Sequence, residues 1–238
     1  MAFLERTAEE VRYPYLAPSE LKARLDAKAI LYLPIGSLEW HNEHLPLGTD
    51  TFHAIAIAER LCRALGGVML PAFWWNTGGA HDYFCTYHMP EDVYRATLKN
   101  VCLGLQAIPA KMLVLINGHG GRFQYETPPV VADELNREGF PMRVLVADPY
   151  YLGKSSPVRI DHADTNETSV ALDLIPQLVR MERPIGPDIK SNNMPFQAKG
   201  PPAAEKGRML WEAFFAEARE LIEGAYGSPQ APRTMPAR

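Results

Sequence analysis

Apolar and polar positions form alternating blocks along the chain, and these blocks predict strands and helices in turn. Short continuous apolar runs predict buried strands at residues 29–35, 68–73, 111–117 and 142–147. Apolar residues at helical spacing, or helix-start signals such as Pro90 followed by two acids, predict helices at 19–28, 50–65, 90–106, 122–138, 166–180 and 203–226. Strands that alternate with helices are typical of an α/β protein with a mainly parallel sheet.

The chain shows no internal repeat and no linker that separates domains. Its 238 residues are 47% apolar, which is enough for one large core. We therefore expect a single α/β domain at residues 1–227. Residues 186–202 form a Pro- and Asn-containing loop, and residues 228–238 form a C-terminal tail that we expect to be mobile.

Net charge indicates which partners the protein can bind, and cysteine spacing indicates the state of its thiols. The 24 Lys and Arg against 28 Asp and Glu give a net charge of -4, which argues against nucleic acid and membrane surfaces and favours a small-molecule partner. Three cysteines, Cys62, Cys85 and Cys102, lack metal-binding or redox spacing and are expected to be reduced and buried in the core. The first 16 residues lack the apolar region of a secretory signal, so we expect a cytoplasmic protein.

One cluster of polar residues follows the predicted strand 29–35, and a second lies at the start of the predicted helix 50–65. In the first, Glu39 and His41 project to the same side if the segment is extended, and they could serve one metal ion or two adjacent ions. The alternative is a solvent-facing loop. In the second, Asp50 opens a predicted helix, where it could cap the helix or bridge two cations about 3.5–4 Å apart.

Two further clusters lie later in the chain. His119 stands among three glycines after the most apolar strand, which favours close approach to a substrate over a phosphate-binding loop, whose spacing is absent. In the last cluster, Asp164 and Glu167 nearly form a capping box, which alone could explain both acids. His162 is not explained by capping, and an imidazole suits a general acid or base beside a metal ion.

All four clusters follow predicted strands or open predicted helices. In an open α/β sheet, ligands bind beyond the carboxyl ends of the strands, so these residues are expected to converge on one crevice. The alternative is that they remain dispersed as caps and turns in a protein that binds a small ligand without catalysis.

Taken together, the clusters resemble the creatininase (creatinine amidohydrolase) family of metal-dependent hydrolases over residues 16–183. The matching segments read PIGSLEWHNEHLP at 34–46, TD at 49–50, NGHGGR at 117–122 and HADTNETS at 162–169. The resemblance implies a three-layer α/β/α fold and a homo-oligomer, commonly a hexamer.

The resemblance also implies roles for individual residues. Two divalent metal ions, Zn, Mn or Fe, would be held by Glu39, His41, Asp50, His119 and Glu167. Asp50 would bridge the ions, and His162 would be the catalytic proton carrier. Gly121 stands where creatininase is expected to have a glutamate ligand, so Glu167 must complete the centre, which argues against creatinine as the substrate.

Departures from the family pattern lie near the expected ligands and predict a reshaped pocket. Trp40, Asn42 and Arg122 replace the family's glutamine, glycine and asparagine, and they are candidate substrate-binding residues together with Trp75 and His81. Trp74 and Trp75 could instead lie in the core or at a subunit interface. His53 is expected to be a packing residue.

The expected reaction is hydrolysis of a C–N amide-type bond in a cyclic amide or formamide, through a water molecule activated by the metal ions. An alternative on the same centre is ring-opening hydrolysis of a carbocyclic keto-polyol, such as an inosose, because fold and metal do not fix the substrate.

Overall fold

The computed structural model describes residues 5–76, 84–149, 152–153, 155–156, 160–183 and 200–227. The strands are β1 (Ile30–Ile35), β2 (Val68–Met69), β3 (Met112–Asn117) and β4 (Arg143–Ala147). The α-helices are α1 (Pro18–Ala27), α2 (Thr49–Leu65), α3 (Glu91–Gly104), α4 (Arg122–Arg137), α5 (Thr165–Leu174) and α6 (Ala204–Tyr226). Two short 3-10 helices are η2 (Tyr13–Tyr15) and η3 (Pro176–Leu178). The expected tail at 228–238 and most of the loop at 186–202 lie outside the described residues.

The described strands form one sheet in the order β2-β1-β3-β4, and every neighbouring pair is parallel. The register pairs Ile35 of β1 with Asn117 of β3, and Ile116 of β3 with Ala147 of β4. The chain passes outward from β1 to β2 and then crosses to β3 on the other side of β1. The boundary between β1 and β3 is therefore the topological switch point, where ligands bind in open α/β sheets.

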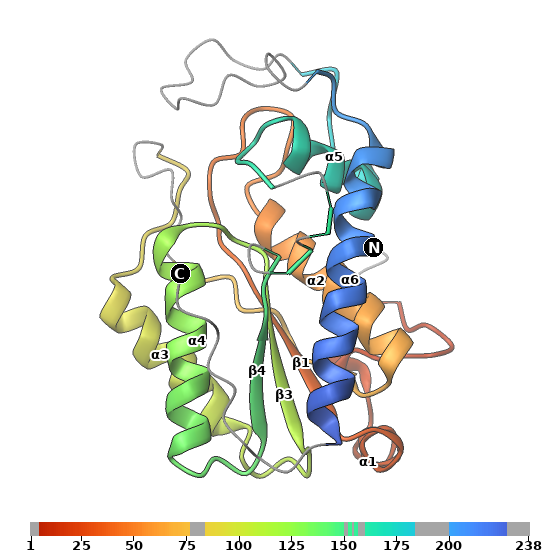
Figure 1. Cartoon of the computed structure of the whole chain (residues 1–238), viewed down its shortest axis with the longest axis vertical. Helices are drawn as coiled ribbons and strands as arrows, with labels where there is room; N and C mark the ends of the chain where they lie inside the picture. The colour runs from red at the N-terminus through yellow and green to blue at the C-terminus, as the bar shows by residue number, and fades with distance from the viewer. Residues whose placement is uncertain are drawn as a thin grey trace.

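Helices cover both faces of the sheet (Figure 1). Helices α3 and α4 lie on one face, and α2 and α6 lie on the other. Because side chains alternate along a strand, Tyr32 and Val114 enter the core on the α2 and α6 side, whereas Leu33 and Leu115 enter the core on the α3 and α4 side. The expected three-layer α/β/α fold with a parallel sheet is confirmed.

Two predicted elements are shorter in the structure than in the sequence prediction, and proline explains both. The predicted helix 166–180 ends as α5 at Leu174, because Pro176 disfavours helical backbone at the residue before it, and η3 follows. The predicted strand 68–73 is regular only over β2. Pro71 interrupts the ladder, and Phe73 rejoins it by a single bridge to Ile35.

Glycine turns connect helices to strands at the end of the sheet away from the switch point. Gly66, with φ 82°, separates α2 from β2, and Gly139, with φ 78°, follows α4 before β4. A Cβ atom added at Gly139 would meet no neighbouring atom within 4 Å. The turn at Gly139 is thus required by backbone conformation and not by packing.

Two of the cysteines match their expected burial, and one does not. Cys62 and Cys102 are buried in the two halves of the core, but Cys85 is only half-buried, so that part of the prediction is wrong. Among the described residues no helix is long and apolar enough to cross a membrane.

Candidate metal centre

The five expected ligands and His162 come together at the switch point. Glu39 and His41 follow β1, and His119 follows β3. Asp50 and Glu167 lie in the first turns of α2 and α5. All five expected ligands are at most 3% exposed.

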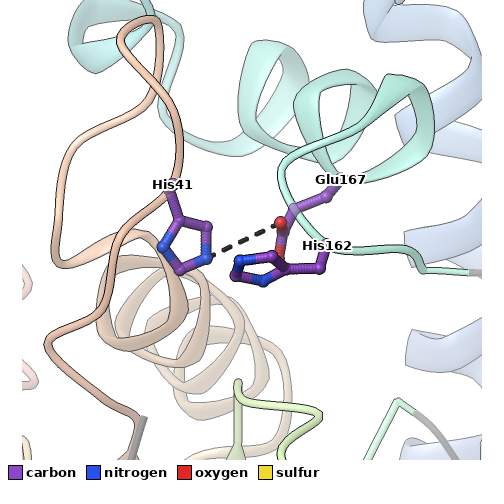
Figure 2. Close-up of side chains that lie close together, drawn as sticks. All are labelled: His41, His162 and Glu167. Carbon is purple, nitrogen blue, oxygen red and sulfur yellow. Dashed lines mark ion pairs between the residues drawn. The ribbon is translucent and has the colours of Figure 1, made fainter. Parts of the chain in front are cut away.

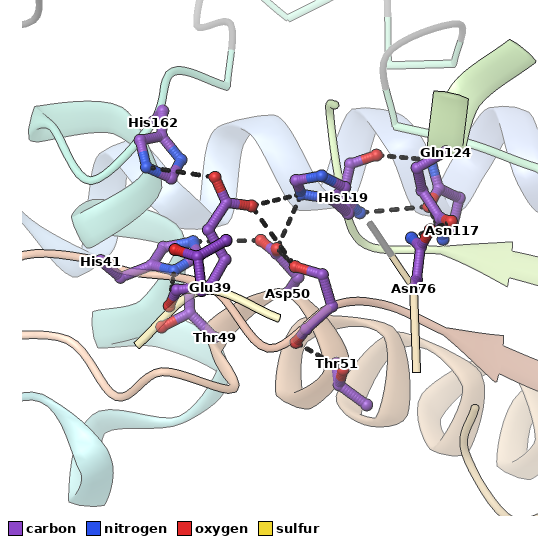
Figure 3. Close-up of polar contacts among 12 residues, drawn as sticks. Glu39, His41, Thr49, Asp50, Thr51, Asn76, Asn117, His119, Gln124 and His162 are labelled. Atoms are coloured by element: carbon purple, nitrogen blue, oxygen red, sulfur yellow. Dashed lines mark hydrogen bonds and ion pairs between the residues drawn. The ribbon is translucent and has the colours of Figure 1, made fainter. Parts of the chain in front are cut away.

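The six side chains form two groups of possible metal-binding atoms. We call Glu39, Asp50 and His119 the inner group, and His41, His162 and Glu167 the outer group. Within each group, one ligand atom from every residue lies within 4.8 Å of the others. Figure 2 shows the outer group, and Figure 3 shows Glu39 and Asp50 between His41 and His162 on one side and His119 on the other.

Asp50 connects the two groups through its two carboxylate oxygens. Its Oδ2 lies 2.8 Å from Nδ1 of His119 in the inner group, and its Oδ1 lies 3.1 Å from Nε2 of His41 in the outer group (Figure 3). Glu39 is divided in the same way, with Oε2 3.1 Å from His119 Nδ1 and Oε1 3.6 Å from His162 Nε2. Both carboxylates therefore contact a histidine in each of the two groups.

The alternative that Asp50 is a helix cap is wrong. The residue at the cap position of α2 is Gly48, and Asp50 is the second residue of the helix. The Ser37 hydroxyl donates a hydrogen bond to Oδ2 of Asp50. A Cβ atom at Gly118 would lie 2.0 Å from the backbone oxygen of Asp50, so only glycine lets the β3 loop approach this helix so closely.

Capping is performed by two aspartates, which leaves the Glu167 side chain available to the centre. Asp164 accepts a hydrogen bond from the Thr165 backbone N–H at 2.6 Å, and Asp161 accepts one from the Glu167 N–H at 2.8 Å. The prediction of Asp164 as a cap is confirmed. Glu167 Oε2 instead accepts from the Ala163 N–H and lies 3.6 Å from Nε2 of His41.

A buried amide network holds His119. The Asn117 amide nitrogen donates to the His119 carbonyl at 2.9 Å and to Oδ2 of Asp148 at 2.8 Å. Its oxygen accepts from the His119 N–H at 3.1 Å and from Nε2 of Gln124 at 2.9 Å. Gln124 in turn accepts from Asn76 (Figure 3). These four polar side chains are fully buried, so their hydrogen bonds fix the loop rigidly.

A second set of contacts orients the outer group. His41 Nδ1 lies 3.0 Å from the Glu39 carbonyl oxygen, so Nδ1–H donates there and Nε2 faces Asp50 and Glu167. His44 Nε2 pairs with the Thr168 hydroxyl at 2.8 Å and ties the β1 loop to α5 beside Glu167.

The sequence analysis assigned no role to Ser37, to His44 or to Gln124 and Asp148, the side-chain partners of Asn117. The positions of some of these residues could have indicated a role. Ser37 and His44 lie inside the first polar cluster, and Asp148 directly follows a predicted strand.

Electrostatics in this centre favour ionised carboxylates. Burial alone would raise the pKa of Asp50, but His41 and His119 hold it well below its usual value. Burial would lower the pKa of His119, but Asp50 and Glu39 raise it to about 9. In the same way, Asp50 and Glu167 raise the pKa of His41 well above its usual value. Protons on the histidines thus supply the positive charge that the buried carboxylates of Asp50 and Glu167 require.

This donor set fits divalent metal ions. The two groups offer carboxylate and imidazole ligands without thiolate, as borderline ions such as Zn, Mn and Fe prefer. Among the described residues, Nε2 of His162 is buried and has no hydrogen-bond partner. The outer group includes His162, so its position suits a ligand as well as a proton carrier.

Two of the expected substrate-binding residues, Trp40 and Asn42, lie at a cavity. The Trp40 ring lies 6.1 Å from the His162 ring, and Trp40 and Asn42 line a cavity of about 730 Å³. Asn42 has φ 63°, the left-handed conformation that explains a glycine in the family pattern, and its Oδ1 accepts from the Glu43 N–H at 2.9 Å.

Trp75 and Arg122 are exposed, and their partners lie outside the six residues of the two groups. Trp75 is 53% exposed and packs edge-on against Tyr87 at 5.2 Å. The Arg122 side chain is 76% exposed and pairs with Glu126 on the surface of α4, so its placement does not support a substrate contact.

Trp74 and His53 pack within the protein, and His81 cannot be compared with them. Trp74 packs edge-on against Phe52 at 5.2 Å, beside the start of α2. His53 is buried within α2, where burial lowers its pKa, as expected for a packing residue. His81 lies outside the described residues.

Comparison with known proteins supplies the context for this geometry. The family model described as "Creatininase: Creatinine amidohydrolase" matches residues 15–231. A creatinine amidohydrolase from Pseudomonas putida is 28% identical over 186 residues, which are 69% of this chain and 72% of that protein. A mycofactocin precursor peptide peptidase from Mycobacterium tuberculosis (strain CDC 1551 / Oshkosh) is 32% identical over 64% of this chain and 61% of its own length.

The name of a more distant relative indicates another kind of substrate. It is a 3-dehydro-scyllo-inosose hydrolase from Thermotoga maritima, which is 23% identical over 72% of this chain and 58% of its own length. Among solved structures, a creatinine amidohydrolase (creatininase) crystal structure has a TM-score of 0.72 at 21% identity and covers 93% of this chain and 100% of its own. Zinc and manganese forms of creatininase have TM-scores of 0.71 and 0.70 at 23% identity. Each covers 92% of this chain and 99% of its own.

Proposed function

The chain belongs to the creatininase family of hydrolases, and from that premise we propose that it cleaves a C–N amide-type bond in a small molecule at a two-metal centre. The observation that carries the proposal is the division of Asp50 between the inner and outer groups, with one oxygen 2.8 Å from His119 and the other 3.1 Å from His41. A carboxylate so placed suits the bridge between two ions.

The proposed ligands are Glu39, Asp50 and His119 on the inner ion and His41, Asp50 and Glu167 on the outer ion. When bound, a pair of divalent ions lowers the pKa of a water molecule toward about 7 and polarises a substrate carbonyl. The chain supplies the remaining chemistry.

We assign His162 the movement of a proton at Nε2 to the leaving nitrogen. Its ring lies 4.7 Å from the His41 ring, and its side chain is 27% exposed, so it can reach both the centre and an entering substrate. The Trp40 ring beside His162 forms an apolar wall that can orient the substrate and exclude water.

The inosose hydrolase relative supports a second candidate, ring-opening hydrolysis of a carbocyclic keto-polyol on the same ligands. Membership of a hydrolase family removes the support for a non-enzymatic binding protein.

The deciding experiment measures metal content by mass spectrometry and then turnover of cyclic amides, formamides, short peptides and inosose-like ketones. We expect two ions per chain and turnover of a C–N bond. Activity on ketones alone would select the second candidate, and a protein that remains metal-free and inactive after reconstitution would refute both. Native mass spectrometry would test the proposed homo-oligomer and its expected hexamer.

A further inference from the structure

A cavity of about 730 Å³ borders the loop after β1 that carries Glu39 and His41, and its volume lies within the usual range of ligand sites, roughly 300–1,000 Å³. Its wall includes Trp40, Asn42, Glu43, Gln177, Arg180 and Arg183. It is therefore mixed in character, with an aromatic ring, two guanidinium groups and one carboxylate.

The cavity and the centre share one segment of chain. In the loop after β1, Glu39 and His41 face the centre, whereas Trp40 and Asn42 line the cavity. Trp40 also contacts the centre's side of this loop, because its ring lies 6.1 Å from the His162 ring. A substrate whose reacting group lies at the centre can thus extend past Trp40 into the cavity.

Two cationic side chains in the cavity lack an acidic partner among the residues that the structure describes. Arg180 and Arg183 form no ion pair there, although exposed arginines elsewhere, such as Arg63 and Arg219, each pair with a glutamate one helical turn away. The Arg180 N–H donates to the His44 carbonyl at 2.8 Å, and the Arg183 N–H donates to the Arg180 carbonyl at 3.0 Å. The backbone therefore fixes both arginines on one turn that is tied to the loop of the metal centre.

We propose that this cavity is a substrate subsite in which Arg180 and Arg183 bind a carboxylate of the molecule whose C–N bond is cleaved. The inference rests on the proposed function and narrows its substrate class to amides that carry a carboxylate. Guanidinium groups match the planar carboxylate and can bind it with two parallel hydrogen bonds. Glu43 on the same wall opposes a doubly charged phosphate more strongly than a singly charged carboxylate.

The first test uses probes without a C–N bond, so that it is independent of turnover. The dissociation constants of 3-phenylpropionate and of its neutral counterpart 3-phenylpropanol are measured by calorimetry or ligand-observed NMR on the metal-containing protein. We expect the acid to bind at least about tenfold more tightly, as one charge-assisted hydrogen-bonded pair supplies. The preference should disappear in the Arg180→Gln/Arg183→Gln double variant and persist in Arg63→Gln/Arg219→Gln, which removes the same charge from α2 and α6.

Three results would overturn the subsite. They are equal affinity for the two probes, a preference that survives in the double variant because the metal ions bind the acid, and tighter binding of inorganic phosphate than of phenylpropionate at the arginines. The fold should tolerate the substitutions, because Arg180 contacts His44 through its backbone and both side chains are exposed. Glu43→Gln should strengthen acid binding severalfold, and weaker binding would mean that the cavity prefers a cation.

A second test links the subsite to catalysis. N-formylphenylalanine and N-formylphenylalaninamide differ only in the carboxylate, and we expect kcat/KM to favour the acid at least about tenfold in the wild type and not in the double variant. Phenylpropionate binding through the arginines without turnover of any amide would retain the subsite and refute the proposed function. Turnover of both formamides without a preference would do the reverse.

Discussion

The inner and outer groups of the centre differ in what holds them. The inner group is built on loops directly after β1 and β3 and on the first turn of α2, and the buried Asn117 network braces His119. In the outer group, the His162 side chain is 27% exposed. The next residue, Ala163, has a left-handed backbone with φ 49°. The sheet and its amide network therefore fix one end of the centre, whereas the other end includes a partly exposed side chain.

The largest expected effect comes from the carboxylate that both groups share. Asp50→Asn keeps the size of the side chain but removes the charge that faces His41 and His119. We expect loss of both ions and a fall in kcat/KM of at least about a thousandfold, since metal stabilisation of the transition state supplies several kcal/mol. Metal analysis and kinetics check this, with the exposed Asp26→Asn as control. Retention of one tightly bound ion would show that the groups are independent.

Two changes in the outer group separate binding of metal from movement of protons. Glu167→Gln should lose the outer ion, retain the inner one and reduce activity by about a hundredfold or more. His162→Ala should retain both ions and lose about 10²–10⁴-fold in kcat, the usual contribution of general acid–base catalysis. The metal-to-protein ratio of each variant shows whether the substituted residue binds metal or moves a proton. Equal loss of metal in both would make His162 a ligand.

Proton competition should act on the inner group over an unusual pH range. Without metal, the pKa of His119 is raised to about 9 from 6.5, so an ion must displace a proton at any lower pH. Metal affinity should rise by up to about tenfold per pH unit from 7 to 9 through this one proton and then level off. Competition titrations with a chelator measure it. An affinity that is constant above pH 7 would contradict the raised pKa.

The same shift predicts how the metal-free protein responds to pH. Because the folded-state pKa of His119 is the higher one, its stabilising contribution is complete below about 6.5 and is lost as pH rises toward 9. Denaturant unfolding of chelator-treated protein should therefore show decreasing stability over that interval, and the His119→Gln variant should show less of the decrease.

The amide network should affect the inner ion through the position of His119. Asn117→Ala removes the buried hydrogen bonds that this amide makes with Gln124, Asp148 and the backbone of His119, which should cost about 1–3 kcal/mol in stability and about 10–100-fold in metal affinity. The exposed Asn100→Ala is the control. An unchanged metal affinity would limit the network to a structural role.

The smallest expected effect lies in the backbone of the outer group. Ala163→Gly removes the strain of a left-handed alanine but adds chain entropy to the unfolded state, so it should stabilise the protein by at most about 1 kcal/mol. The helical Ala96→Gly should instead destabilise it by about 1 kcal/mol. Thermal unfolding of both variants gives the comparison, and similar losses in the two would show that Ala163 is not strained.

Much of the fold could be predicted because its strands are short apolar runs and its helices carry strong start and stop signals. The order of the strands and the extent of β2 could not, since Pro71 and the pairing of Phe73 with Ile35 act over long range. The family motif identified the residues that the structure brings together. It did not reveal the exposed placement of Arg122, which depends on a local pair with Glu126.

The glycine turn at Gly139 has a practical consequence. It lies at the end of the sheet remote from the candidate ligands, and open space surrounds the position where its side chain would be. A fluorescent tag or an affinity peptide inserted there would leave the reacting end of the molecule undisturbed, so this turn is a suitable attachment point for surface immobilisation or labelling.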